Sequence, residues 1–393
     1  MVLGQDMGST LHYIGLMSGT SMDGVDAVLA AFAPNGRPQV VSRAQVAIPP
    51  DLRQELMALN QPGDNELHRA SMAANALARV YATAVHHVLS LSGMTPSKVS
   101  AIGAHGQTVR HQPALGYTIQ LNAPALLAEL TGIDVIADFR SRDVAASGQG
   151  APLVPIFHQT VFGCEHVRVI LNLGGIANIT VLRPGEVPLG CDTGPANMLL
   201  DLWCQEHTGA AYDKNGDWSL SGQPLDRLLD HLISSEPWFA AQPPKSTGRD
   251  LFNAQWLKSR LDAHAKIQAT SGQILGLRAQ DVQATLRQLT ARTIAETIRQ
   301  LAPDTRDVIV CGGGVKNPAL MHDISVALPG CQIRSTLDEG IDPQDVEALA
   351  FAWLAWAHQQ KTAGNIPAVT GAAGPRVLGA TWPANVRPVS SAS

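Results

Sequence analysis

The stretch that decides the fold lies near the start of the chain and reads Ile14-Gly15-Leu16-Met17-Ser18-Gly19-Thr20-Ser21-Met22-Asp23-Gly24-Val25-Asp26. The apolar runs at 12–17 and 25–30 have the length and composition of β-strands. Glycine, serine, threonine and aspartate between them are typical of a turn, but seven residues exceed what a tight hairpin needs. The sequence is compatible with a long hairpin loop and with a ligand-binding turn at this place. Amides and hydroxyls of such a turn can hold phosphate oxygens, and Asp23 or Asp26 can position a metal ion or its waters.

The residues that follow predict a mixed α/β domain. A third strand at 39–48 extends the hairpin into a meander, and a 3.6-residue apolar period over 64–93 predicts one long helix. Further short strands are predicted at 99–104, 117–121 and 133–137, with a helix at 125–130. Strands that first form a meander and then alternate with helices make a mixed sheet with helices packed on it.

The second half of the chain begins with a similar pattern. Strands are predicted at 167–173 and 176–182, separated by the turn that contains Gly174 and Gly175. A strand, a small-residue turn and a second strand therefore occur twice. This repetition predicts two similarly built domains related by duplication.

The length of the chain agrees with this division. Its 393 residues correspond to about two domains of ordinary size. We place the first domain at 1–143 and the second at 144–393, and leave open that the extreme C-terminal segment, after Gly364, returns to the first.

Charge and hydropathy exclude several classes of partner. The net charge is −5, so no large cationic field attracts nucleic acid or an anionic membrane. The longest strongly apolar run, 348–357, is shorter than the roughly 18 residues that span a bilayer. The N-terminal residues lack the pattern of a secretory signal, which predicts a cytoplasmic protein without membrane or nucleic-acid partners.

Two further glycine-rich turns could carry chemistry. In Gly190-Cys191-Asp192-Thr193-Gly194-Pro195-Ala196-Asn197 an aspartate ends a predicted strand, and a Thr-Gly-Pro turn is predicted to open a helix. Asp192 either projects toward a ligand or is only the N-cap of that helix. Gly312, Gly313 and Gly314 follow a buried strand and either admit a flat ligand or form a tight turn. Neither of the two commonest nucleotide motifs, GxGxxG and GxxxxGK[ST], is present.

Two polar residues in the first half are also candidates. His105 ends a predicted strand between glycines, as a substrate-facing side chain would, although a structural histidine explains it equally well. Arg140 follows the strand at 133–137. Its guanidinium could recognise a carboxylate or phosphate, or form an ion pair with a neighbouring aspartate.

The three glycine-rich turns, each at a strand end, resemble the two phosphate elements and the adenosine element of the actin/hexokinase/heat-shock-chaperone ATPase superfamily. Within it, the chain resembles the anhydro-N-acetylmuramic acid kinase family from about residue 13 to about residue 379. The stretches that carry this resemblance are 14–26, 103–108, 138–143, 172–178, 192–197 and 312–317. Ala196 departs from the glycine that we expect in many relatives. The implied fold is two duplicated actin/hexokinase-like (ribonuclease H-like) domains, with mixed sheets flanked by helices and an interdomain cleft.

The resemblance implies a phosphotransferase of cell-wall peptidoglycan recycling. In the implied reaction, water opens the ring of 1,6-anhydro-N-acetylmuramic acid while its O6 accepts the γ-phosphate of ATP. The products are N-acetylmuramic acid 6-phosphate and ADP. The resemblance also implies ATP and Mg²⁺ as cofactors, and a homodimer.

The same resemblance assigns roles to residues. Asp192 is the general base that activates water, and Arg140 faces the sugar or the transferred phosphoryl group. Glu347 is a second carboxylate near the sugar, or a first-turn residue favoured by its helix dipole. Sugar contacts are expected from His105, Gln107, Asn178 and Arg140. ATP contacts are expected from Gly19, Thr20, Ser21, Met22, Asp23, Gly24, Val25, Asp26, Gly174, Gly175, Asn178, Gly312, Gly313 and Gly314. The metal ligands are not assigned, although Asp23 is a candidate through a water.

Other classes of function compete with this interpretation. A sugar kinase of the same superfamily would act on a free hydroxyl, and a non-catalytic ATP-binding sugar sensor would release no ADP. A chaperone-like or actin-like protein would need a peptide-binding domain or filament surfaces, for which two domains leave little room.

Overall fold

The computed structural model describes residues 10–19, 22–243, 245–249, 251–270 and 276–384. The chain divides into two compact units, one formed by Met1–Val161 with Asp345–Ser393 and the other by Phe162–Gln344. These boundaries differ from the predicted division at 143/144, and the chain returns to unit 1 well before Gly364. The reason is the helix α13 (Val346–Gln359), which packs against three strands of the first sheet.

The main sheet of unit 1 has six strands in the order β13-β7-β4-β1-β2-β3. β1, β2 and β3 form the predicted antiparallel meander, and β4 and β7 run parallel to β1. The strands are β1 (Leu11–Ser18), β2 (Gly24–Phe32), β3 (Pro38–Ala47), β4 (Ala101–Ala104), β7 (Val135–Ala137) and β13 (Ala380–Trp382). A separate hairpin joins β5 (Gln107–Gln112), which sequence did not predict, to β6 (Tyr117–Leu121).

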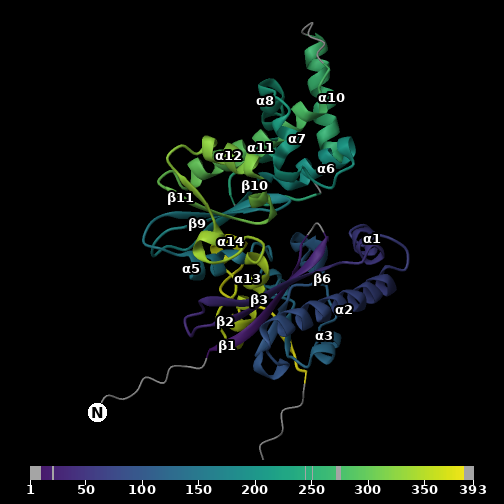
Figure 1. The fold of residues 1–393 in the computed structure, drawn as a ribbon, viewed down its shortest axis with the longest axis vertical. Helices are drawn as coiled ribbons and strands as arrows, with labels where there is room; N and C mark the ends of the chain where they lie inside the picture. The colour runs from purple at the N-terminus through teal and green to yellow at the C-terminus, as the bar shows by residue number, and fades with distance from the viewer. Residues whose placement is uncertain (1–9, 20–21, 244, 250, 271–275, 385–393) are drawn as a thin grey trace, which may run out of the picture. The chain divides into compact units, whose positions relative to one another are not determined.

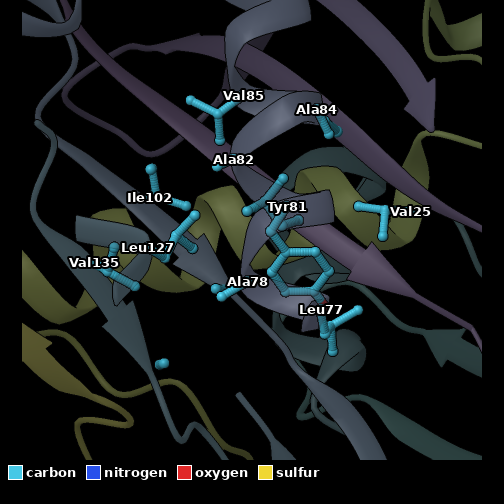
Figure 2. Close-up of a cluster of buried hydrophobic side chains, with 14 of the residues drawn as sticks. Val25, Leu77, Ala78, Tyr81, Ala82, Ala84, Val85, Ile102, Leu127 and Val135 are labelled. Carbon is cyan, nitrogen blue, oxygen red and sulfur yellow. The ribbon is translucent and has the colours of Figure 1, made fainter. Parts of the chain in front are cut away.

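The long helix α2 (Glu66–Ser92) covers one face of this sheet (Figure 1). Figure 2 shows Leu77, Tyr81 and Val85 of α2 in the cluster of buried side chains that also holds Val25 of β2 and Ile102 of β4. The remaining helices of unit 1 are α1 (Pro50–Ala58), α3 (Pro124–Thr131), α4 (Ser141–Ala145), α5 (Val154–Phe162, which ends at the boundary) and α14 (Pro367–Thr370).

The other face of the sheet is closed by α13, which approaches very near to the strands. Gly15 of β1 and Gly103 of β4 are partners in the parallel ladder. A Cβ atom added at Gly15 would overlap the carbonyl oxygen of Ala348, and one at Gly103 would overlap that of Phe351. These two glycines therefore allow the backbone of α13 to lie directly on the sheet.

The sheet of unit 2 has five strands in the order β10-β9-β8-β11-β12. β8, β9 and β10 are antiparallel, and β11 and β12 continue parallel to β8. This is the order and sense of β3-β2-β1-β4-β7 in unit 1, so the predicted duplicated α/β fold is confirmed. The strands are β8 (Arg168–Leu173), β9 (Ile176–Leu182), β10 (Leu189–Pro195), β11 (Asp307–Cys311) and β12 (Gln332–Ser335).

Helices of unit 2 pack on this sheet and on one another, with α11 contacting β9, β10 and four other helices. The segment 211–253 contains several short helices. The helices are α6 (Asn197–Thr208), α7 (Asp217–Leu220), α8 (Asp226–Ser234), α9 (Pro237–Ala240), α10 (Ala254–Thr270), α11 (Ala279–Leu301) and α12 (Pro318–Ala327). Short 3-10 turns lie at Pro96–Lys98, Pro113–Leu115, Lys214–Gly216, Gly313–Lys316 and Thr336–Glu339.

Within the described ranges, no helix combines the length and the apolar character that a membrane span requires.

Candidate active site

The first glycine-rich turn joins β1 to β2, as predicted. The Met22 amide donates to the Gly19 carbonyl oxygen at 3.1 Å, and Met22 adopts a left-handed backbone conformation (φ 55°). Asp23 is exposed and forms an ion pair with Arg53 at 3.0 Å. Gly24 and Val25 begin β2, and Asp26 accepts a hydrogen bond from Gln45 at 2.9 Å. Thr20 and Ser21 lie outside the described residues.

The second glycine-rich turn, between β8 and β9, is bonded to the start of α6. The Gly174 carbonyl oxygen accepts from the amide of Asn197 at 3.1 Å, and that of Gly175 accepts from Ala196 at 2.9 Å and from Met198 at 3.1 Å. These helix-start amides are therefore already paired within the protein. The helix terminus offers an anion fewer donors than an open N-terminus would.

The third glycine-rich turn packs against the second. Gly312 has φ +84°, and a Cβ there would overlap the Asn172 side chain. A Cβ at Gly314 would lie 2.6 Å from the Cβ of Leu173. At Gly313 no atom of the described residues would lie within 4 Å of an added Cβ. Gly312 and Gly314 thus serve close packing, whereas Gly313 faces open space that a ligand can approach.

Asp192 lies within β10 and not at the start of a helix. Thr193, Gly194 and Pro195 continue the strand, because pairing with β9 extends to Pro195, and Ala196 is the N-cap of α6. The predicted Thr-Gly-Pro turn is therefore wrong, and the interpretation of Asp192 as an N-cap is excluded. The ladder shifts register between Asp192 and Gly194. Gly194 has a φ of +145°, a backbone conformation that glycine permits. Bulges of this kind re-aim neighbouring side chains.

The carboxylate of Asp192 is held by residues 246 and 247. Its Oδ2 accepts from the Thr247 amide at 2.8 Å and from the Ser246 hydroxyl at 3.1 Å. No donor in the described part of the chain reaches Oδ1. Burial raises the pKa of Asp192 to about 6, against the opposing effects of Thr247, Ser246 and the charge of Lys245. At neutral pH the group is ionised, with one oxygen fixed and the other able to accept a proton.

Asn178 is the cross-strand partner of Asp192 in the β9–β10 ladder, so the structure brings these two predicted residues together.

In unit 1 the structure brings His105 and Arg140 together. The Nε and Nη2 groups of Arg140 lie 3.1 and 3.0 Å from His105 Nε2, and Nη1 donates to the Gly150 carbonyl oxygen at 2.7 Å. Burial, with the charge of Arg140, lowers the pKa of His105 well below its usual range. The ring is therefore neutral and carries its proton on Nδ1, which is buried and has no hydrogen-bond partner among the described residues.

Arg140 itself stays cationic. Desolvation lowers its pKa to about 10, opposed by the negative charges of Glu347 and Asp143. Glu347 lies in the first turn of α13, as predicted, and its charge acts on Arg140. One helical turn later, the ring of Phe351 packs at 4.6 Å on His105. The close approach of α13 to the sheet thus places Glu347 and Phe351 beside the His105–Arg140 pair.

Asp143 is a fully buried residue that sequence analysis did not single out. Its Oδ1 accepts from Asn365 at 2.6 Å and from Thr370 at 2.7 Å, and its Oδ2 accepts from the Gly150 amide at 2.7 Å. Gly150 in turn binds Arg140, so Asp143 links the returning C-terminal segment to the predicted arginine. No local sequence signal connects residues more than 200 positions apart.

Gln107, the first residue of β5, is buried, and its Oε1 has no hydrogen-bond partner in the part of the chain that the structure describes. The same holds, within those residues, for the buried Oδ1 of Asn122, which sequence analysis missed. Among the described residues, no group of three or more histidine, cysteine, aspartate or glutamate side chains is placed to hold a metal ion.

The duplicated mixed sheets define an α/β protein of the actin/hexokinase-like class. The family model described as Anhydro-N-acetylmuramic acid kinase matches residues 11–384. The chain is 59% identical over 372 residues to a protein of that name from Bordetella pertussis (strain Tohama I), covering 95% of this chain and 96% of the relative. It is 52% identical over 383 residues to one from Ralstonia nicotianae (strain GMI1000), covering 95% and 97%. The chain belongs to the anhydro-N-acetylmuramic acid kinase family and is a phosphotransferase.

Proposed function

We propose that this chain opens the ring of 1,6-anhydro-N-acetylmuramic acid with water and transfers the γ-phosphoryl group of ATP to O6. The products are N-acetylmuramic acid 6-phosphate and ADP, formed during peptidoglycan recycling. Membership of the family over residues 11–384 carries this proposal. The carboxylate of Asp192, ionised at neutral pH with Oδ1 open, supports it chemically.

Asp192 is the general base in this scheme. It takes a proton from water as the water oxygen bonds to the anomeric carbon and the bond from that carbon to O6 breaks. O6 accepts the γ-phosphoryl group, ADP leaves, and Asp192 releases its proton to solvent. Ring opening itself produces the nucleophilic O6, so no second strong base is needed. General-base catalysis by one side chain typically contributes about 10²–10⁴-fold.

His105, Arg140, Gln107 and Glu347 act on the sugar side. The Nδ1–H of His105 is a buried donor that no acceptor within the described residues reaches, which suits a sugar hydroxyl. The cationic Arg140 balances negative charge that develops on O6 or on the phosphoryl group. Glu347 is the second carboxylate near the water, and Gln107 and Asn178 complete the sugar contacts.

ATP is proposed to contact the three glycine-rich turns. The phosphates contact the first turn, Gly19 to Asp26, together with Gly174, Gly175 and Asn178. The adenosine contacts the third turn, where Gly313 faces open space within the described residues. Because the described residues provide no cluster of metal ligands, they fit a Mg²⁺ ion held mainly by phosphates and waters, with Asp23 acting through a water. Such an ion neutralises phosphate charge during transfer.

We further propose a cytoplasmic homodimer with no membrane or nucleic-acid partner. The resemblance stated above supports the dimer, and the net charge of −5 disfavours polyanions. Light scattering on the purified chain tests the dimer, which predicts a mass twice the 41.6 kDa of one chain.

The test of the reaction is an assay with ATP, Mg²⁺ and one of three sugars: glucose, N-acetylmuramic acid or its 1,6-anhydro form. The proposal expects a product heavier than the anhydro sugar by roughly 80 daltons for phosphoryl transfer and about 18 for water. Phosphorylation of a free sugar but not of the anhydro form would indicate an ordinary sugar kinase. Absence of ADP release with every sugar would indicate a sensor.

A further inference from the structure

Residues 245–247 are bonded to Asp192 from two directions. The Asp192 amide donates to the Lys245 carbonyl oxygen at 3.2 Å. Two residues later, the Thr247 amide donates to Asp192 Oδ2 at 2.8 Å. The backbone of this short segment therefore follows both the main chain and the side chain of Asp192.

The same segment is fixed on its other side by α9. Lys245 Nζ donates to the Phe239 carbonyl oxygen at 3.0 Å and lies 4.5 Å from the ring centroid of Trp238. Trp238 Nε1 donates to the Ser246 carbonyl oxygen at 3.1 Å. Residues 245–247 are thus anchored at both ends, which gives Thr247 a defined position beside the carboxylate.

The hydroxyl of Thr247 is a buried polar group that the reaction scheme has not used. Its Oγ1 is buried and has no hydrogen-bond partner within the described ranges. A buried hydroxyl left unpaired destabilises the fold, and such groups are normally satisfied by protein or by an ordered water.

The covalent geometry of threonine limits how far this hydroxyl lies from the carboxylate. Oγ1 lies three bonds from the residue's own nitrogen, so the two atoms are roughly 3–4 Å apart. That nitrogen is 2.8 Å from Asp192 Oδ2. The hydroxyl is therefore within roughly 7 Å of Asp192 Oδ2 and does not bond to it directly, so one bridging water can join the two groups.

We propose that Thr247 is a further catalytic residue that holds the attacking water jointly with Asp192. This inference rests on the proposed function. Oγ1 of Thr247 binds the water, while the open Oδ1 of Asp192 takes its proton as the water oxygen bonds to the anomeric carbon. The bond from that carbon to O6 breaks, O6 receives the γ-phosphoryl group and ADP leaves. The Thr247 hydroxyl is unchanged at the end.

The test is Thr247→Val, which keeps the amide that binds Oδ2 and removes only the hydroxyl. We expect kcat to fall about 10–100-fold, the effect of losing one hydrogen bond of roughly 1.4–2.7 kcal/mol in the transition state. KM for the anhydro sugar and the Kd for ATP should change less than about 3-fold, because the water contacts neither ground state strongly. Thr247→Ser should restore kcat to within about 3-fold.

The matched control is Thr83→Val, the same change on the exposed surface of α2, which should leave kcat unchanged. Thr247→Ala removes the hydroxyl without adding a buried methyl group, and should reproduce the Thr247→Val result if that variant folds poorly. A wild-type kcat in both removal variants, or a loss that serine does not restore, overturns the inference. An inactive wild-type chain instead overturns the proposed function itself.

Discussion

The two sheets have the same strand order but differ at one equivalent position. Gly15 lies three residues before the last ladder pair of β1 and β2, and is paired with Gly103 of β4. Ile170 lies three residues before the last pair of β8 and β9, and is paired with Ile309 of β11. In unit 1 two glycines admit a helix backbone, whereas in unit 2 two fully buried isoleucines occupy the space.

The third strand of each meander differs as well. β3 alternates between half-buried and exposed residues along its whole length, and its register shift against β2 lies in the middle of the ladder, at Leu29 and Ala30. β10 is shorter and breaks register between Asp192 and Gly194, next to the carboxylate that we propose as the base. The same strand order therefore positions functional groups in two ways. In unit 1 the close approach of α13 to the sheet positions them, and in unit 2 an irregular strand positions a carboxylate.

The largest effect is expected from removing the charge that the β10 bulge positions. Asp192→Asn keeps an oxygen that accepts from Thr247 and Ser246 but cannot take a proton from water. We expect kcat to fall about 10³-fold or more, with ATP affinity unchanged. Equilibrium binding of a non-hydrolysable ATP analogue and steady-state kinetics measure the two quantities. A variant that phosphorylates the anhydro sugar at the normal rate would show that Asp192 is not the base.

The next effect tests the glycine pair directly. Gly15→Ala places a Cβ against the backbone of α13, which cannot move away without leaving the sheet. We expect the free energy of unfolding to fall by roughly 3 kcal/mol or more. Ile170→Val, at the equivalent place in unit 2, removes one methylene and should cost only about 1 kcal/mol. Gly63→Ala, in an exposed loop, is the control. Equal losses at Gly15 and Ile170, measured by urea denaturation, would contradict the contrast between the sheets.

A smaller effect is expected from the arginine beside α13. Arg140→Lys retains a positive charge but cannot bind His105 and Gly150 together, because the ammonium is a single point of contact. We expect kcat to fall about 10–100-fold through misplacement of that charge. Arg142→Lys, two residues later on an exposed position, should have no effect. If both variants behave alike, Arg140 acts only through its charge.

The smallest effect is a dependence on pH. Burial raises the pKa of Asp192 to about 6, so the base is protonated below that value and kcat should fall tenfold per unit of acidification. The folded state binds this proton more tightly than the unfolded state, which costs stability above pH 6 and relieves that cost as pH falls from 6 to 4. Asp192→Asn should therefore raise the melting temperature at pH 7. A pH profile without an acid limb would contradict the raised pKa.

The sequence predicted the parts of the fold that local pattern determines. The meander β1–β3, the turns at both strand pairs and the helix α2 follow from alternation, glycine-rich turns and helical periodicity. The missed elements include β5, β12 and α10. β12 lies at a sheet edge and is short, and α10 has only weak apolar periodicity, so little in their own sequences distinguishes them from loops.

The candidate site was less accessible to sequence reasoning. The turn expected at 193–195 is a strand because β9 pairs with it, an interaction that local propensity does not reveal. Thr247 lies 55 positions from Asp192, and Asn365 lies 222 positions from Asp143. Contacts over such separations depend on the topology of the folded chain, and for that reason the motifs identified Asp192, Arg140 and His105 but not Thr247 and Asp143.

The most direct test of the central claim is the anomeric configuration of the first product, recorded by proton NMR before mutarotation. If water activated by Asp192 displaces O6 directly, the new hydroxyl forms on the face opposite to C6, and the α anomer of N-acetylmuramic acid 6-phosphate appears first. An initial β anomer, an equilibrium mixture from the start, or a phosphorylated sugar whose anhydro ring is intact would contradict the account.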